Sequence, residues 1–153
     1  MIEEKFMRIA LKEANKAKEK DEVPIGAVIV VDDKVIAKAF NKRNASGIAT
    51  HHAEILAIEK ACKKIKDWRL ENATLYVTLQ PCPMCAGAAM NARINKIVFG
   101  AFDRTGLNKN LFNEICEDTR LNHKIDIQGG VLEEECSKLL TDFFAQKRKI
   151  NKK

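Results

Sequence analysis

The chain has 153 residues, of which 46% are hydrophobic and 31% are charged. This length and composition predict one globular domain, which we expect to span residues 1–149, followed by a short basic tail at 150–153. The longest apolar stretch, 25–31, is far shorter than the roughly 18 residues that a membrane-spanning helix needs. The N-terminus mixes acidic and basic residues where a secretory signal needs a cationic segment followed by an apolar run, so we expect a cytoplasmic protein.

The formal net charge is +6, and the positive charge is unevenly distributed along the chain. Five basic residues stand near the C-terminus with no acidic residue among them: Lys147, Arg148, Lys149, Lys152 and Lys153. Without them the rest of the chain is almost neutral. We therefore expect attraction to phosphate groups to be concentrated at the C-terminal end. A charged tail that only increases solubility would have the same composition.

The N-terminal half is predicted to contain two helices and a hairpin. Apolar residues at helical spacing predict an amphipathic helix over 3–20. Two apolar strands at 25–31 and 35–40, joined by a short polar turn, predict an antiparallel hairpin. Residues 41–50 show no periodicity and are expected to form a loop, and a second helix is predicted over 52–65.

The C-terminal half continues with alternating strands and helices. A strand is predicted at 73–78, a helix at 84–92 and a strand at 97–100. The remainder is predicted to form a loop, a short helix, a strand and a last helix, at 102–110, 111–116, 124–128 and 132–149. This order of elements predicts an α/β fold in which a mixed sheet is covered by helices on both faces.

Two short segments carry the residues expected to do chemistry, and each lies where a predicted helix begins. Cys82 and Cys85 are three residues apart, so on one helical turn both sulfur atoms lie on the same face and can bind one metal ion. Thiolate and imidazole ligands suit zinc, and His52 provides a third ligand. The sequence therefore predicts one Zn²⁺ ion held by His52, Cys82 and Cys85, with a fourth position left open.

Glu54 follows His52 by two residues, which decides where the second helix must begin. Inside a helix these side chains would point about 200° apart, whereas in the first turn both lie close to the helix end. We therefore expect the helix to begin near His52 and to place Glu54 beside the metal without binding it. Zinc lowers the pKa of bound water to about 7, and Glu54 is the predicted catalytic residue that takes and returns the proton.

Other interpretations of these segments remain open at this stage. A C-x-x-C pair by itself is also typical of redox sites and of structural zinc sites. A closed structural zinc site would need a fourth protein ligand, for which the candidates are Cys62, Cys116, Cys136, His51 and His123. His51 could also replace His52, although only His52 has the two-residue spacing to Glu54.

The pattern H-x-E followed by P-C-x-x-C is the signature of zinc-dependent nucleobase deaminases. Over nearly its whole length the chain resembles the bacterial tRNA-specific adenosine deaminases. The resemblance rests on the segments 22–28, 52–54, 68–70, 75–79 and 82–88, and on Asn41, Asp103, Asn122, His123, Phe143 and Phe144. The chain departs from the family pattern at Gln80, where Glu is usual, at 48–51, where Asp-Pro-Thr-Ala is usual, and in a shorter loop after Asp103.

The resemblance implies a three-layer α/β/α fold of the cytidine deaminase type, a homodimer, and hydrolytic conversion of adenosine to inosine at the wobble position of a tRNA anticodon. It implies no contact with membranes or DNA. The residues implied to face the substrate adenosine are Val28, Asn41, Ala53 and Asp103. The residues implied to contact the anticodon stem-loop are Asn122, His123, Phe143, Phe144, Lys147 and Arg148.

Two other functions are compatible with the same metal-site residues. One is the deamination of a free base or nucleoside such as guanine or cytosine, for which the basic C-terminus would have no use. The other is a zinc-containing RNA-binding module without turnover. Adjacent helical positions cannot both point fully inward, so we also expect one of Phe143 and Phe144 to be exposed.

Overall fold

The computed structural model describes residues 2–104 and 109–151, with the backbone alone at Lys109 and Asn151. Its strands form one mixed sheet in the order β2-β1-β3-β4-β5. They are β1 (Gly26–Val31), β2 (Lys34–Phe40), β3 (Ala73–Leu79), β4 (Lys96–Ala101) and β5 (Asp126–Gln128). Strand β1 is antiparallel to both neighbours, whereas β3, β4 and β5 are parallel to one another. The predicted hairpin and mixed sheet are confirmed.

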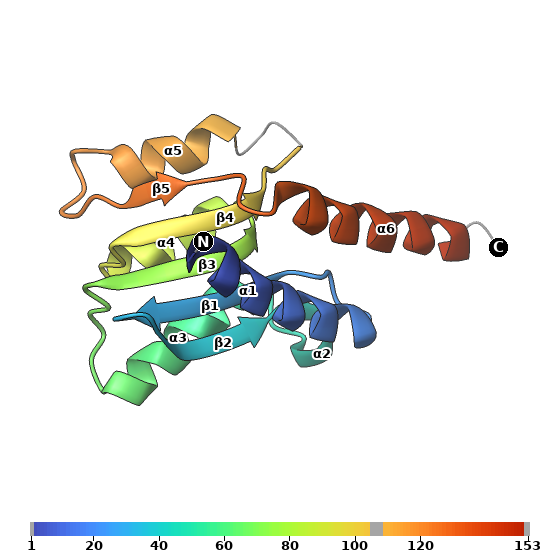
Figure 1. Cartoon of the computed structure of the whole chain (residues 1–153), viewed down its shortest axis with the longest axis horizontal. Coiled ribbons are helices and arrows are strands. Elements are labelled where there is room, and N and C mark those ends of the chain that lie inside the picture. Colours follow the sequence, from blue (N-terminus) through green and yellow to red (C-terminus); the bar gives the residue numbers. More distant parts are fainter. Residues whose placement is uncertain (1, 105–108, 152–153) are drawn as a thin grey trace.

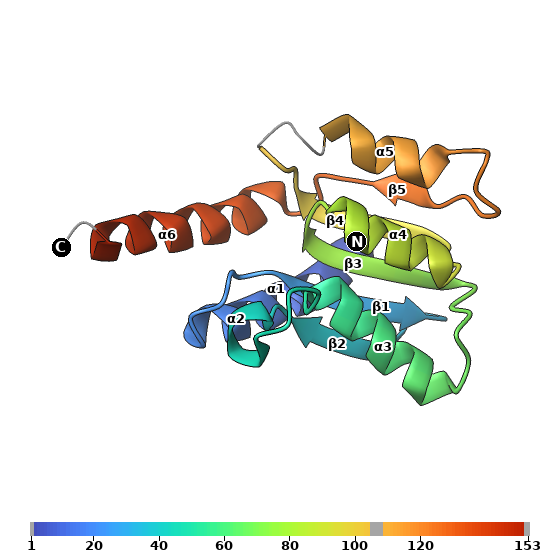
Figure 2. The ribbon, with the colours of Figure 1, turned by 180° about the vertical axis from the view of Figure 1, so that it is seen from behind.

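Helices cover both faces of the sheet, as Figures 1 and 2 show from opposite sides. They are α1 (Ile2–Glu19), α2 (Arg43–Ser46), α3 (Ala53–Ile65), α4 (Pro83–Asn91), α5 (Lys109–Glu117) and α6 (Glu133–Asn151). One apolar cluster packs α3, α4 and α5 against one face, and a second packs α1 and the start of α6 against the other. This confirms the predicted layers. Among the described residues, no helix combines the length and hydropathy that crossing a membrane requires.

The first helix packs directly on the start of β1, because Gly26 has no side chain there. A Cβ atom at Gly26 would collide with the carbonyl oxygen of Ala10. This close packing sets the distance between α1 and the sheet. Glu22 lies in the segment that connects α1 to β1.

The segment 41–50, predicted as a loop, contains the short helix α2. The carboxylate of Glu22 accepts hydrogen bonds from the backbone N–H groups of Asn44, at 3.0 Å, and Ala45, at 2.6 Å. The helix ends at Gly47, which has φ 69°. The prediction was wrong because the group that stabilises the first turn comes from a residue 22 positions earlier.

Helix α6 extends to Asn151, past the predicted end at Lys149. The expected tail at 150–153 therefore begins within this helix, and Lys152 and Lys153 lie outside the described residues. The expected loop at 102–110 also lies partly outside them.

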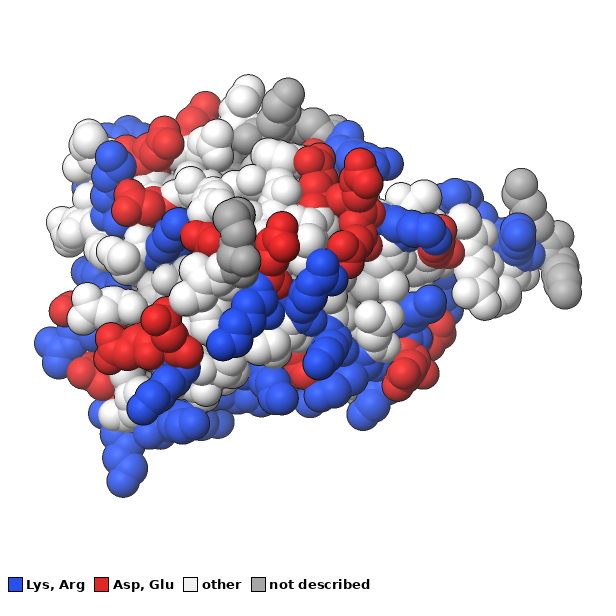
Figure 3. All heavy atoms as spheres, in the orientation of Figure 1, with Lys and Arg blue, Asp and Glu red and all other residues white. Residues whose placement is uncertain are grey.

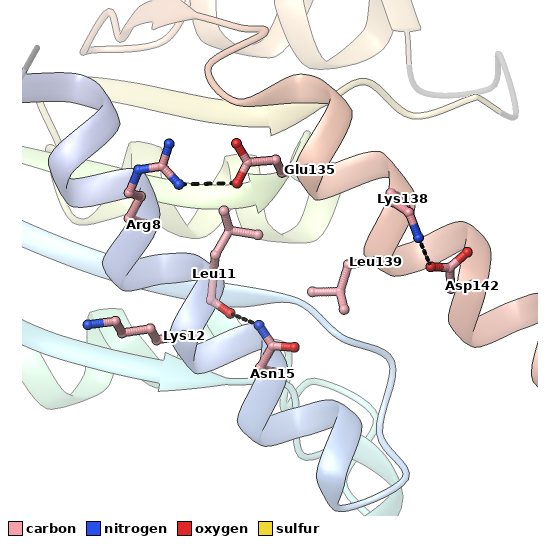
Figure 4. A pocket seen from close by; sticks show the side chains of 8 residues that line it. All are labelled: Arg8, Leu11, Lys12, Asn15, Glu135, Lys138, Leu139 and Asp142. Atoms are coloured by element: carbon pink, nitrogen blue, oxygen red, sulfur yellow. Dashed lines mark hydrogen bonds and ion pairs between the residues drawn. The ribbon is translucent and has the colours of Figure 1, made fainter.

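Two ion pairs connect α6 to the α1 region. Arg8 and Glu135 pair at 3.2 Å across a groove of about 450 Å³ between α1 and α6, as Figure 4 shows. Lys147 pairs with Asp21 at 2.5 Å. Lys147 therefore has an acidic partner although none stands near it in the sequence, because folding brings the turn after α1 next to the last helix.

Candidate active site

The predicted metal ligands meet where two helices begin. His52 immediately precedes α3, and Cys82 immediately precedes α4, with Cys85 in the first turn of α4. Both flanking residues have extended backbones, with ψ 155° at His52 and 169° at Cys82. The prediction that the second helix begins near His52 is confirmed, and the two helix N-termini face one another on one side of the sheet.

The spacing of the three ligand atoms fits a zinc ion. His52 Nδ1 lies 3.6 Å from Cys82 Sγ and 3.5 Å from Cys85 Sγ, and all three atoms lie within 4.8 Å of one another. A tetrahedral ion with Zn–S bonds of about 2.3 Å and Zn–N bonds of about 2.0–2.1 Å separates nitrogen from sulfur by about 3.6 Å. We call His52, Cys82 and Cys85 the ligand group.

The charge state of the ligand group also suits a metal. The pKa of the Cys82 thiol is lowered to about 4, mainly because Cys85 donates a hydrogen bond to the thiolate, with a further hydrogen bond from His52. The same bond to Cys82 raises the pKa of Cys85, and the bond with Cys82 raises the pKa of His52. A thiolate at Cys82 is the form that binds metal ions.

Glu54 lies next to the ligand group without belonging to it. It is the second residue of α3, and only 4% of its surface is exposed. Burial raises the pKa of its carboxyl, against the opposing effect of its own backbone N–H, and the Cys85 thiol is hydrogen-bonded to it. A buried carboxyl with a raised pKa exchanges protons at a higher pH than an ordinary glutamate, which suits a proton shuttle.

The ligand group contains three protein ligands. In the part of the chain that the structure describes, no further His, Cys, Asp or Glu joins it. His52 and not His51 belongs to the group, and Cys116 and Cys136 are buried in the apolar clusters. This arrangement matches a catalytic zinc site, with three protein ligands and an open position, better than a closed structural site.

Asn41 lies on the segment that leads into the ligand group. Its side-chain oxygen accepts a hydrogen bond from the Arg43 N–H at 3.3 Å, and its amide donates to the Val23 carbonyl at 3.4 Å. The next residue, Lys42, donates its backbone N–H to the carbonyl of His51 at 3.1 Å. Asn41 is therefore fixed close to His52, and Ala53 is the fully buried first residue of α3.

Asp103 is held by the residue at which the chain departs from the family pattern. Gln80 is buried, and its side-chain oxygen accepts a hydrogen bond from the Asp103 N–H at 3.1 Å. Asp103 also lines a cavity of about 380 Å³ together with Phe144 and Arg148 of α6. The structure thus brings together three predicted site residues that are up to 45 positions apart.

The two adjacent phenylalanines of α6 differ in exposure, as predicted. Phe143 is 7% exposed, whereas Phe144 is 43% exposed. Lys147 lies over the Phe143 ring at 5.7 Å and pairs with Asp21, so its charge is partly balanced. Phe144 and Arg148 are the pair on α6 that faces the cavity beside Asp103.

Three predicted substrate or RNA contacts lie away from the ligand group. Val28 is fully buried in the cluster on the α1 side, because side chains alternate along β1 and its neighbours face α3. His123 donates from Nε2 to the Ile94 carbonyl at 2.7 Å, just before β4 begins, and the adjacent Asn122 is exposed. Because β3 and β4 are parallel, this position lies at the opposite end of the sheet from Cys82.

Glu22 is a site-organising residue to which the sequence interpretation gave no role. Its surface is 1% exposed, and its two hydrogen bonds hold α2 between Asn41 and His51. A buried glutamate has no local sequence signal, because its partners are backbone groups of a distant segment. The only indication was its place in the segment 22–28 of the family resemblance.

Comparisons with known proteins identify deaminases as relatives of this chain. The family model of MafB19-like deaminases matches residues 1–148. A tRNA-specific adenosine deaminase of Bacillus subtilis (strain 168) is 50% identical over 150 residues, which cover 98% of this chain and 93% of the relative.

Solved structures have the same fold. One comes from a study of A-to-I editing by tRNA:A34 deaminases at the wobble position of transfer RNA. It has a TM-score of 0.82 and 41% identity, and the match covers 88% of this chain and 98% of that one. A guanine deaminase from Nitrosomonas europaea has a TM-score of 0.78 at 21% identity, over 91% and 82% of the two chains, and supports the fold alone. The expected cytidine deaminase-like fold is confirmed, and the chain belongs to the family of tRNA-specific adenosine deaminases.

Proposed function

We propose that this chain is a zinc-dependent enzyme that hydrolyses adenosine to inosine and ammonia at the wobble position of a tRNA anticodon. The observation that carries the proposal is the ligand group beside the buried carboxyl of Glu54. Membership of the tRNA-specific adenosine deaminase family supports adenosine in tRNA as the substrate.

His52, Cys82 and Cys85 would hold the zinc ion. When bound, zinc supplies a water molecule whose pKa is about 7 and which is therefore nucleophilic at neutral pH. The ligand distances and the thiolate at Cys82 support this assignment.

Glu54 would move the protons. It accepts a proton from the attacking water and protonates the ring nitrogen next to the carbon that carries the amine. It then takes the remaining proton from the hydroxyl now attached to that carbon and transfers it to the amine, so that the C–N bond breaks, ammonia departs and the carbon keeps the oxygen as a carbonyl. Its buried position and raised pKa support both the accepting and the donating role.

The residues around the ligand group would select the substrate. We assign the contacts with the extruded adenosine to Asn41, Ala53 and Asp103. A base that is already unpaired in a loop is extruded at the least cost. Phe144 offers an exposed ring on which a neighbouring base can stack, and Arg148 offers a cation for a phosphate.

The expected homodimer and cytoplasmic location remain predictions. An apolar cavity of about 450 Å³ next to the ligand group supports a second copy as its cover, since Ile55, Pro83, Met84 and Leu121 line it. Sedimentation of the purified protein checks the dimer, because a monomer at assay concentration would contradict it.

The proposed function is tested by metal analysis together with product analysis. We expect about one zinc per chain and inosine at the wobble position of tRNA after incubation with the protein. Free guanine, cytosine and adenosine are assayed in parallel by ammonia release. Ammonia from a free base without inosine in tRNA would overturn the tRNA assignment, and a protein without any turnover would be a binding module.

A further inference from the structure

Four lysines from separate parts of the chain meet near the outer edge of β2. We call Lys16, Lys20, Lys42 and Lys60 the β2-edge cluster. Lys20 and Lys42 both lie over the ring of Phe40, at 5.5 and 5.0 Å from its centroid. The pKa of Lys60 is lowered, first by burial and then by the positive charges of Lys42 and Lys16, while Glu13 acts in the opposite direction. All four ammonium groups therefore belong to one region.

The β2-edge cluster keeps most of its positive charge. Lys16 pairs at 2.7 Å with Glu13, whose side chain is 5% exposed. In the described part of the chain, the other three lysines form no ion pair with an acidic group. Figure 3 shows basic side chains gathered along the lower border of the molecule, where α3, β2 and α2 lie in Figure 1.

The cluster adjoins the candidate active site. Lys42 donates its backbone N–H to the carbonyl of His51, the residue before the ligand His52. The cluster extends from there along α1 and across β2 to α3. Helix α6, with Arg148, connects to the turn after α1 through the pair of Lys147 with Asp21. A nucleic-acid strand that enters the site from the α6 side and continues past Lys42 would meet the cluster.

Edge strands often carry lysines merely to prevent pairing with other sheets. That role needs lysines along the strand itself, whereas Lys16 comes from α1, Lys20 from the turn after it and Lys60 from α3. Burial is the main cause of the lowered pKa of Lys60, and the positive charges of Lys42 and Lys16 lower it further, while Glu13 only partly opposes them. A polyanion that passes the site would offset these positive charges.

We propose that the β2-edge cluster binds the sugar-phosphate backbone of the RNA substrate, next to the nucleotide that enters the active site. This inference rests on the proposed function and adds to it a phosphate-binding surface separate from the C-terminal end. Lysine ammonium groups bind phosphates as point charges and release condensed counterions, so their contribution to affinity decreases as salt increases. The contact is independent of base sequence.

The test compares two double variants of the full chain that lose the same charge. Lys20→Gln/Lys60→Gln removes half of the cluster. It leaves Lys16 to pair with the buried Glu13, and it leaves Lys42 in the segment beside His51. Lys96→Gln/Lys124→Gln removes two lysines near β5, at the opposite edge of the sheet. Binding of full-length tRNA and kcat/KM for inosine formation are measured from low to moderate salt.

We expect the cluster variant to bind tRNA more weakly at low salt. The slope of log affinity against log salt should become shallower by about 0.7–0.9 for each lysine removed. The control variant should keep the wild-type slope, and Lys20→Arg/Lys60→Arg should restore binding because it keeps both charges. Thermal unfolding of all variants is measured to show that they are folded.

An unchanged slope in the cluster variant, or an equal change in the control, would overturn the inference. These results differ from a failure of the proposed function, in which the wild-type protein makes no inosine in tRNA at any salt concentration. The binding measurement does not depend on turnover, so the two conclusions are tested separately.

Discussion

The ligand group and the rim of the candidate active site are built in different ways. The ligand group uses residues at the starts of two helices: His52 and Cys82 immediately precede α3 and α4, and Cys85 lies in the first turn of α4. The rim is made of Asn41, Asp103, Phe144 and Arg148, which are held by contacts with Val23, with Gln80 and within α6. Glu22 holds the helix α2, which follows Asn41.

Because of this difference, the residues proposed for catalysis and those proposed for substrate selection can change independently. A ligand group fixed by helix geometry needs only that two helix starts meet at the end of the sheet. A rim held by single hydrogen bonds and ion pairs from distant segments can change between relatives without disturbing that geometry. Gln80 illustrates this point, because its amide oxygen still accepts the Asp103 N–H where a glutamate is usual in the family.

The largest effect is expected from removing a metal ligand. Cys85→Ser should lose most of its zinc, and deamination should decrease by at least about 10³-fold, because the metal contributes several kcal/mol to catalysis. Zinc content and inosine formation are measured together. Cys62→Ser is the control, because Cys62 lies outside the ligand group and should keep both. A zinc-loaded, active Cys85→Ser protein would show that the ligand group is not the metal site.

The next effect separates Glu54 from the ligands. Glu54→Gln keeps the shape of the side chain but removes its ability to transfer protons, so kcat should decrease by about 10²–10⁴-fold with zinc content unchanged. Single-turnover inosine formation and metal analysis provide the measurement. Glu59→Gln, on the exposed side of the same helix, should behave as wild type. Loss of zinc in Glu54→Gln would instead indicate a role in metal binding.

A smaller effect is expected from changing Glu22, which holds the helix α2 next to the rim. Glu22→Gln replaces one accepting oxygen by an NH₂ group that faces backbone N–H groups of α2. The free energy of unfolding should decrease by about 1.5–3 kcal/mol, as for hydrogen bonds to a charged group. Denaturant unfolding measures this change, and amide exchange at Asn44 and Ala45 shows whether α2 is released.

The matched control for Glu22 is Glu71→Gln, which changes an exposed glutamate. We expect it to have no measurable effect on unfolding. Zinc content should be unchanged in both variants, because the ligand group does not depend on α2. Protected amides at 44 and 45 in Glu22→Gln would contradict the proposed restraint.

The smallest effects compare two adjacent cations of α6. Lys147 is paired with Asp21, whereas Arg148 lines the cavity with Asp103 and Phe144. Arg148→Gln should reduce the salt dependence of tRNA binding by about 0.7–0.9 in slope, as for one phosphate contact. Lys147→Gln should change it less, and the Lys147–Asp21 pair should contribute about 0–1 kcal/mol to stability. Equal effects of the two substitutions on tRNA binding would show that the pair with Asp21 does not keep Lys147 from contacting the RNA.

Charge distribution is where the sequence was least informative. Along the chain, positive charge stands out only at the C-terminus, and the body is almost neutral. In the fold, Lys147 is paired with Asp21, while lysines 44 positions apart gather at the edge of β2. Net charge per segment cannot reveal this, because electrostatic interaction depends on distances that only the tertiary structure sets.

The sequence by itself determined the layers of the fold and the ligand group, because both follow from local periods. Hydrophobic spacing defined the helices and strands, the spacing of His52 and Glu54 fits only the start of a helix, and the spacing of Cys82 and Cys85 puts both sulfur atoms on one face of a helical turn. Tertiary structure alone decided the helix α2, the position of His123, the burial of Val28 and the β2-edge cluster. In each of these the decisive contact joins residues far apart in the chain, and no local pattern records such a contact.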